Sequence, residues 1–289
     1  MNGHFVFSLF FMKNYEAILS IDSLNKMREL VGFQFPEEIT SLISTTDWYN
    51  FTDEDNAFDF LSERLSDSQH KSMIISKLSQ IFSPHINADF NNSSAANKVL
   101  RKHDENHYYS IVNAFEITEN FNECNLVENT SDYYQIHEKY LFLAPESNED
   151  YASRCILLFD RVKFTSDFHV TLSTLGNGQG IIGYAEKITK AISTLNSINP
   201  EIREIGKVMH WIHERCGFEC SEQGKNKKHL CPTVTLDDKS EIEINCEFHI
   251  KVNTRENGGQ KTEHSRIYFG LMPYGQEKYC YIHHCGEHL

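Results

Sequence analysis

No run of apolar residues in this sequence approaches the ~20 residues that a membrane-spanning helix needs. Residues 5–12 (FVFSLFFM) are apolar, but the run is short and has no basic flank, so we expect a buried strand or the start of a helix there and not a secretory signal. Eight cysteines in 289 residues are too few for a disulfide scaffold. We therefore expect a cytoplasmic protein with reduced thiols and no membrane contact.

The motifs of the common enzyme classes are also missing. There is no nucleophile elbow, no HExxH helix and no kinase motif set. Residues 176–183 (GNGQGIIG) match the spacing G-x-G-x-x-G, but Ile181 and Ile182 stand where a P-loop has Lys and Ser or Thr. The strands that we expect before this segment are antiparallel, which favours a flexible turn over a dinucleotide cradle. The sequence therefore indicates no cofactor.

Charge is unevenly distributed along the chain. Residues 1–150 contain 10 Lys and Arg against 24 Asp and Glu, whereas residues 151–289 contain 17 of each, so the whole net charge of −14 lies in the first half. A protein that grips nucleic acid needs a basic surface to displace counterions, and the first half has no such excess. It is better suited to a basic protein partner, or simply to keeping the protein in solution. The neutral second half could bind RNA only through a local patch.

The first half shows mainly helical periodicity. Apolar residues recur at helical spacing in residues 15–31, 55–65 and 71–81, and Pro36 with two following acids predicts another helix start. Residues 87–97 (NADFNNSSAAN) are predicted to be a polar loop. We expect a strand in residues 133–134 and 140–143, and a linker in residues 145–150 (PESNED). These features and the charge predict a domain boundary near residue 150.

The second half shows strand patterns around two helices. We expect strands at residues 155–159, 162–172 and 234–236, and helices at residues 182–198 and 201–216. Residues 241–253 alternate strictly between apolar and polar, and residues 264–271 and 278–284 alternate in the same way. The predicted fold class is therefore α+β. An acidic, mainly helical domain (1–150) precedes a domain (151–289) with a terminal antiparallel sheet and two helices.

The polar face of these three terminal strands is the candidate catalytic site. Neighbouring strands lie ~5 Å apart, so strands in register would collect several polar side chains on one face. The candidates are Glu247, His249, Lys251, Arg266, Tyr268 and His283. Metal-independent RNA cleavage needs a base, an acid and a cation near the phosphorane. His249 or Glu247 would be the base, and His283 the acid. Lys251 and Arg266 would supply the cations. The alternative is an ordinary solvated face.

Cysteine and histidine gather in the second half and raise the question of zinc. Cys216 with Cys220, and Cys280 with Cys285, resemble finger spacings but not the usual Cys-x₂-Cys. The alternation places Cys246 on the buried face, and free cysteine is commonly buried. We therefore expect core cysteines, no metal site and a mobile tail at residues 283–288. A zinc-pinned domain is the alternative. Glu247 and Lys251 share one face but are farther apart along the strand than in the usual PD-(D/E)xK geometry, so a metal-dependent nuclease is a weaker alternative.

The end of the chain carries one resemblance. Residues 266–269 (RIYF) and 281–289 (YIHHCGEHL) resemble a hairpin at the C-terminus of uncharacterised bacterial mobile-element proteins. They are similar, more distantly, to the last hairpin of RelE-type toxins, in which an Arg-Ile-x-Phe strand precedes the final strand. RelE-type toxins are small and basic, whereas this chain is long and acidic. The resemblance implies a setting in toxin–antitoxin or phage-defence systems and carries over no catalytic residue.

Two hypotheses of different class follow. In the first, the C-terminal domain is a metal-independent RNA endonuclease that the acidic half restrains or delivers. In the second, the protein is a non-catalytic accessory subunit of a defence complex, and its acidic half (residues 1–150) binds a basic nuclease or ATPase partner. The sequence leaves open whether the protein is an enzyme.

Overall fold

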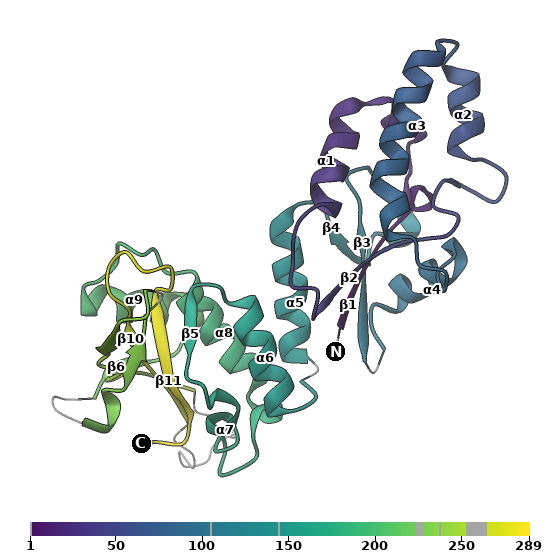
Figure 1. Ribbon diagram of the computed structural model, residues 1–289. Coiled ribbons are helices and arrows are strands. Elements are labelled where there is room, and N and C mark those ends of the chain that lie inside the picture. Colours follow the sequence, from purple (N-terminus) through teal and green to yellow (C-terminus); the bar gives the residue numbers. More distant parts are fainter. Residues whose placement is uncertain (1, 105, 144, 224–227, 237, 253–264) are drawn as a thin grey trace. The chain divides into compact units, whose positions relative to one another are not determined.

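The computed structural model describes residues 2–104, 106–143, 145–223, 228–236, 238–252 and 265–289 (Figure 1). Helices make up 44% and strands 20%, so the fold is mixed α and β. The chain divides into two compact units, Met1–His137 and Glu138–Leu289. This division lies before the predicted boundary at residue 150, inside helix α5 (Thr130–Leu143). The predicted linker overlaps the first turn of α6 (Asn148–Leu158), which the Ser147 hydroxyl caps.

The N-terminal unit is built on a parallel sheet of order β2-β1-β3-β4. The strands are β1 (Asn2–Phe7), β2 (Thr40–Ser44), β3 (His107–Val112) and β4 (Asn125–Val127). The α-helices are α1 (Ile21–Val31), α2 (Ala57–Arg64), α3 (Ser68–Phe82), α4 (Asn92–Arg101) and the first part of α5. Short 3₁₀ turns are η1 (Leu9–Phe11), η2 (Tyr15–Leu19), η3 (Ser83–His85) and η4 (Glu119–Phe121). Parallel strands that alternate with helices define an α/β unit.

Both faces of this sheet are covered. On one face Ala95 and Val99 of α4 pack into a buried cluster with Val6, Ile43 and Ile111 from three strands. On the other face the ring of Phe5 lies 4.7 Å from that of Tyr133 in α5, and the ring of Phe7 lies 5.5 Å from that of Phe82 in α3. Because both faces are buried, the second half of β1 (Phe5, Val6 and Phe7) is continuously apolar and does not alternate.

Several predictions for the N-terminal half are therefore wrong. Residues 36–38 turn directly into β2 and start no helix, and residues 87–97 contain the start of α4. That helix begins with a capping box between Asn91 and Ser94, so its polar residues satisfy the free backbone N–H groups of the first turn. Residues 133–134 and 140–143 lie in helix α5 and form no strand.

The C-terminal unit contains a five-stranded sheet of order β5-β11-β10-β9-β6. Its strands are β5 (Val162–Phe164), β6 (Cys220–Glu222), β9 (Phe248–Lys251), β10 (Arg266–Leu271) and β11 (Cys280–Gly286). Only β5 and β11 pair in parallel among the described strands of this sheet. The strands β7 (Thr233–Thr235) and β8 (Glu241–Glu243) pair separately. The helices are α6, α7 (Phe168–Leu172), α8 (Ala185–Asn196) and α9 (Ile205–Cys216), with turns η5 (Ile181–Gly183) and η6 (Lys228–Leu230).

Some elements predicted for this unit are present, and others are wrong. The three terminal strands are neighbours, and α8 and α9 occupy the two predicted helical segments. Residues 155–159 are helical up to Leu158, and residues 162–172 hold a short strand and then α7. Residues 241–253 do not form one strand, because β8 and β9 belong to different sheets. Residue 253 of the first alternating segment and residue 264 of the second lie outside the described residues.

The first prediction concerns a glycine in β10. A Cβ at Gly270 would lie 2.4 Å from the backbone oxygen of Asn245 and 2.5 Å from a methyl carbon of Ile244. Backbone cannot move aside as a flexible side chain can, so we expect Gly270→Ala to lower the free energy of unfolding by about 1–3 kcal/mol. Gly206→Ala is the matched control, since nothing lies within 4 Å of its Cβ. Urea unfolding of the two variants measures the difference, and equal midpoints would contradict the packing of residues 244–245 against β10.

Candidate functional site

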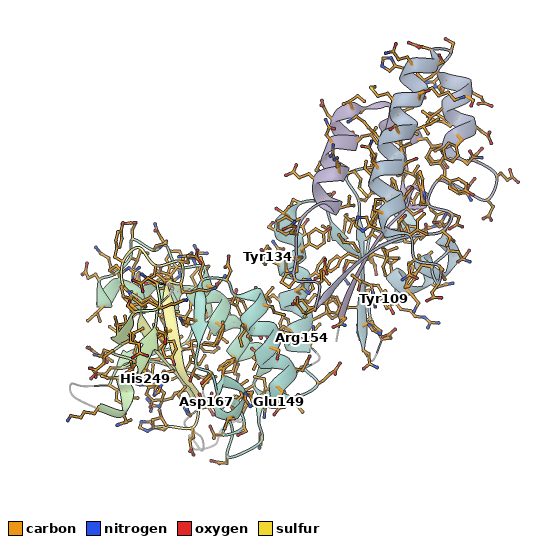
Figure 2. The ribbon with its side chains drawn as sticks, in the orientation of Figure 1. Tyr109, Tyr134, Glu149, Arg154, Asp167 and His249 are labelled. Atoms are coloured by element: carbon orange, nitrogen blue, oxygen red, sulfur yellow. The ribbon has the colours of Figure 1, made fainter. Side chains whose placement is uncertain are left out.

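The terminal sheet brings four of the six predicted site residues together. The register of β9 and β10 places Lys251 opposite Arg266 and His249 opposite Tyr268. The ring centroids of His249 and Tyr268 lie 5.4 Å apart. On the next strand, His284 is opposite Tyr268, with 6.0 Å between the ring centroids. One face of the sheet therefore carries a row of aromatic and imidazole rings across three strands, and Figure 2 labels His249 within it.

A serine that the sequence analysis missed extends this row. Ser221 of β6 is opposite His249 of β9, and its Oγ lies 3.0 Å from Nε2 of His249. Nδ1 of His249 lies 3.5 Å from the backbone oxygen of Glu247, at the long limit of a hydrogen bond. If Nδ1 donates its proton to that carbonyl, Nε2 accepts the Ser221 hydroxyl proton. The pair has the geometry of a nucleophile and its base. A three-residue strand is too short to show alternation, so no pattern pointed to Ser221.

The electrostatics of the row do not favour catalysis. His249 is only 4% exposed, and burial lowers its pKa from 6.5 to about 4, with a further contribution from the Arg266 charge. At neutral pH it is therefore an uncharged imidazole and a weak base. Tyr268 is completely buried, and burial raises the pKa of its phenol. A general base works best when its pKa lies near the working pH. The pKa of His249 lies well below neutral pH.

Residues 287–289 cover the row. The backbone N–H of Leu289 donates to Oη of Tyr268 at 3.3 Å, and the ring of His288 lies 6.4 Å from the Tyr268 ring. The side chain of Gln223 donates to the Leu289 backbone oxygen at 3.4 Å. The prediction of a mobile tail at residues 283–288 is therefore wrong, since β11 continues to Gly286 and the following residues pack on the sheet.

The other two candidates lie apart from the row. Glu247 is buried and lines a cavity of about 230 Å³ together with Ile205 of α9. Nε2 of His283 lies 3.1 Å from the backbone oxygen of His229. The register of β10 and β11 shifts between Tyr268 and Phe269, so His284, and not His283, faces Tyr268. An irregularity of this kind leaves no trace in the alternation of a single strand.

No group of three or more His, Cys, Asp or Glu within the described segments could hold a metal ion. All eight cysteines have free thiols. Cys246 and Cys280 are completely buried, and burial raises the pKa of both thiols. These two cysteines are core residues, as we expected, and the alternation had placed Cys246 on the buried face. Among the described residues no helix is long and apolar enough to cross a membrane.

A polar cluster in the N-terminal unit surrounds Tyr109, which Figure 2 labels. Nζ of Lys98 donates to Oη of Tyr109 at 3.1 Å, and this hydroxyl donates to Asp104 at 2.9 Å. The cluster borders a cavity of about 380 Å³ that Arg101 also lines. Lys98 and Arg101 lie in the last turn of α4, where the helix dipole favours cations over anions. Their position at the helix end therefore accounts for these charges without a ligand.

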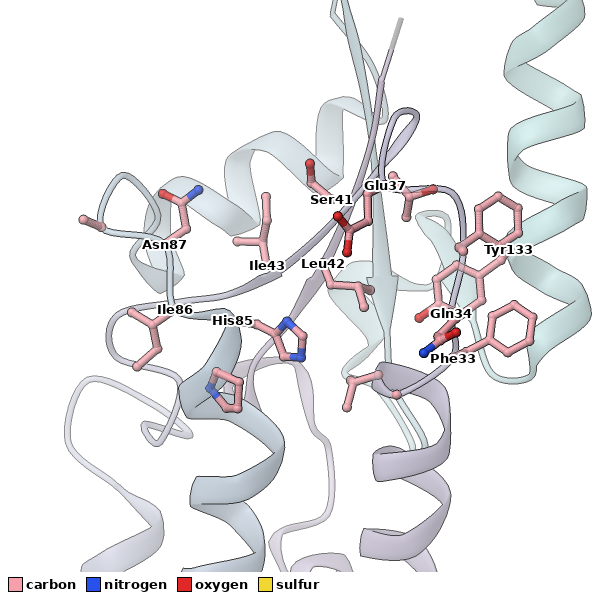
Figure 3. A pocket seen from close by; sticks show the side chains of 16 residues that line it. Phe33, Gln34, Glu37, Ser41, Leu42, Ile43, His85, Ile86, Asn87 and Tyr133 are labelled. Carbon is pink, nitrogen blue, oxygen red and sulfur yellow. The ribbon is translucent and has the colours of Figure 1, made fainter. Parts of the chain in front are cut away.

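A groove of about 1110 Å³ runs along the open edge of the N-terminal sheet (Figure 3). We call it the β2 groove, and it is lined by residues 31–35, 37, 40–43, 84–88 and 133. Figure 3 shows Leu42 of β2 between two walls: Phe33, Gln34 and Tyr133 on one side, and the segment around His85 and Ile86 on the other. Its volume is that of a site for a sizeable ligand.

Stacked rings build the first wall of the β2 groove. The ring of Phe33 stacks on Tyr133 at 5.8 Å, and the ring of Phe35 stacks on His137 at 4.6 Å. His137 is buried, and its ring nitrogens contact the hydroxyls of Tyr108 and, at 2.9 Å, of Thr40. The Tyr133 hydroxyl donates to the backbone oxygen of Leu30 at 3.0 Å. Because hydrogen bonds hold the rings of His137 and Tyr133, the wall is in place without a ligand.

Acidic side chains flank the β2 groove at both ends. Glu37 and Glu38 precede β2, and Asp89 follows the wall at residues 84–88; all three are exposed. The ion pairs described in this unit use none of them. Residues 1–137 contain 9 Lys and Arg against 20 Asp and Glu. The groove therefore lies in an acidic surface that favours a cationic ligand.

Comparisons of the chain with protein-family models, with curated proteins and with solved structures find no match.

The second prediction is a pH dependence of stability. The unfolded imidazole of His249 takes up a proton near pH 6.5, whereas the folded one does so only near pH 4. In this window the unfolded state binds more protons, so the free energy of unfolding should fall as the pH is lowered from about 6.5 to about 4. His249→Gln removes this contribution, and its stability should depend less steeply on pH. Urea unfolding between pH 7 and 4.5 measures the slope.

The control is His210→Gln, at an exposed position on α9. If the stability of the wild type and both variants depends on pH in the same way, His249 is not buried in neutral form.

Proposed function

We propose that this protein is a non-catalytic binding protein whose N-terminal unit holds a segment of a basic protein partner in the β2 groove. The observation that carries the proposal is the groove itself, which has a preformed aromatic wall and an acidic rim. Binding sites are typically concave and largely preformed, with aromatic side chains and a few polar groups. The excess of acid in residues 1–137 supports a basic partner over nucleic acid.

The state of the terminal sheet also supports a binding function over RNA cleavage. His249 and Tyr268 are buried beneath residues 287–289, so RNA has no access to them in this arrangement. The lowered pKa of His249 makes it a weak base at neutral pH. The RNA endonuclease hypothesis therefore stays a prediction for an arrangement in which these residues are uncovered. A setting in phage defence or toxin–antitoxin systems, with a nuclease or ATPase as the partner, also stays a prediction.

The third prediction tests the groove by charge reversal. Glu37→Lys with Asp89→Lys reverses the charge at both ends of the groove. We expect this variant to lose a basic partner, with affinity roughly tenfold lower, because two attractive contacts become repulsive. The tagged full-length chain is used to capture partners from extracts of the source cells, and mass spectrometry quantifies each captured protein.

The matched control is Asp53→Lys with Glu54→Lys, which makes the same charge change at exposed positions of the same unit outside the groove. The proposal requires a basic protein that the control and the wild type retain and that the groove variant loses. Equal capture of every partner by the two variants would remove the groove as the binding site.

A further inference from the structure

The β2 groove has an open sheet edge as its floor. β2 is the outermost strand of its sheet and pairs on one side with β1. Natural proteins commonly protect such edges with Lys, Pro, a bulge or a covering segment, because free N–H and C=O groups recruit further strands. The sequence of β2 is TSLIS, which contains neither a charge nor a proline. This edge therefore lacks the usual residues that prevent strand addition.

The register shows which backbone groups point outward. The N–H of Gly3 donates to the oxygen of Ile39, so the backbone groups of Ile39, Ser41 and Ile43 face β1. The intervening residues face away. At the far end of the strand, the outward oxygen of Ser44 accepts from the N–H of Asn87. For the outward backbone groups of Thr40 and Leu42, the described residues provide no hydrogen-bond partner. Two outward donors and two outward acceptors are therefore open to a ligand.

We infer that the partner segment binds as an additional strand on β2, in extended form, through the outward backbone groups of Thr40 and Leu42. This inference rests on the proposed function and names its mode of binding. Main-chain hydrogen bonds of this kind give affinity, and pockets for alternate side chains give specificity. The added strand lies beside Phe33 and Tyr133, and it ends where Ile86, which is 46% exposed, already bridges to Ser44.

The length and charge of the segment follow from the same geometry. The open edge extends from Thr40 to Ile43, about 13 Å along an extended strand, so four or five residues of the partner fill it. Acid lies at both ends, with Glu37 and Glu38 before β2 and Asp89 beyond it. The segment therefore carries Lys or Arg on both sides of a short core of residues that favour β-structure.

Charge also distinguishes this occupant from a second copy of the chain. If β2 of one copy paired antiparallel with β2 of another, Glu37 and Glu38 of each copy would approach Asp89 of the other. In a parallel pair the same acidic residues would face each other. Like charges in close contact oppose association, whereas a basic segment meets attraction at both ends. The groove is therefore matched to a partner of opposite charge.

The fourth prediction uses a phage-displayed library of random ten-residue peptides as the probe, selected on the immobilised full-length protein. We expect the selected peptides to carry net positive charge. The affinity of each synthetic peptide is then measured by fluorescence anisotropy against wild type, Leu42→Pro and Leu42→Ala. Proline removes the outward N–H and is tolerated on edge strands, whereas alanine keeps the N–H and shortens the side chain. We expect Leu42→Pro to bind at least tenfold more weakly than Leu42→Ala, because the peptide carbonyl is left without a donor.

A second measurement needs no protein variant and so holds if Leu42→Pro fails to fold. N-methyl groups are placed one at a time along a selected peptide. If the peptide forms a strand, methylation at every second residue abolishes binding and the intervening positions tolerate it. Loss without this alternation, or equal binding by the proline and alanine variants, would overturn strand addition.

The outcomes separate this inference from the proposed function. If peptides bind Glu37→Lys/Asp89→Lys more weakly but show no alternation in the methyl scan, the groove is kept as the binding site. That result contradicts only the added strand. If peptide affinity changes neither with Glu37→Lys/Asp89→Lys nor with N-methylation, the groove is not the binding site either. A wild-type dimer in light scattering that Leu42→Pro converts to a monomer would assign the edge to a second copy and overturn the inference.

Discussion

Binding at the β2 groove depends on the backbone N–H and C=O groups along the outer edge of β2. A buried backbone N–H or C=O is nearly always paired, and an edge strand must leave its outward groups to water or to another chain. In this unit the sheet is covered on both faces by helices, so its edge is where main-chain groups remain open. The stacked rings of Phe33 and Tyr133 stand beside that edge and add apolar surface to it.

The C-terminal sheet shows the opposite arrangement. Its polar row is satisfied within the protein: Ser221 pairs with His249, and Tyr268 accepts from the backbone of Leu289. Burial keeps the imidazole uncharged and lowers its pKa. A buried polar group that lacks a hydrogen-bond partner lowers the stability of the fold. The hydrogen bonds of this row therefore favour the observed register of the strands over other registers. The chemistry of these residues is therefore explained by the packing of the sheet.

The sequence predicted the parts of the fold that one-sided burial makes visible. Alternation located β9, β10 and β11, and helical spacing located α3, α8 and α9. Prediction from the sequence failed where both faces of a strand are buried or where an element is short. Phe5, Val6 and Phe7 are all buried, so β1 shows no alternation, and β2 has only five residues. The polar start of α4 resembled a loop because Asn91 and Ser94 serve as caps. The polar residues of the terminal face were found, but their burial under residues 287–289 depends on tertiary contacts that no local pattern contains.

Amide hydrogen exchange measures directly whether a strand is added at β2. It is followed by NMR, residue by residue, in the full-length protein with and without a selected basic peptide. The N–H groups of Ser41 and Ile43 already bond to β1 and should exchange slowly in both states. Those of Thr40 and Leu42 should exchange fast in the free protein and slowly in the complex, since only they gain partners from an added strand. Protection that appears elsewhere, or that leaves Thr40 and Leu42 fast in the complex, would contradict the binding of a strand at this edge.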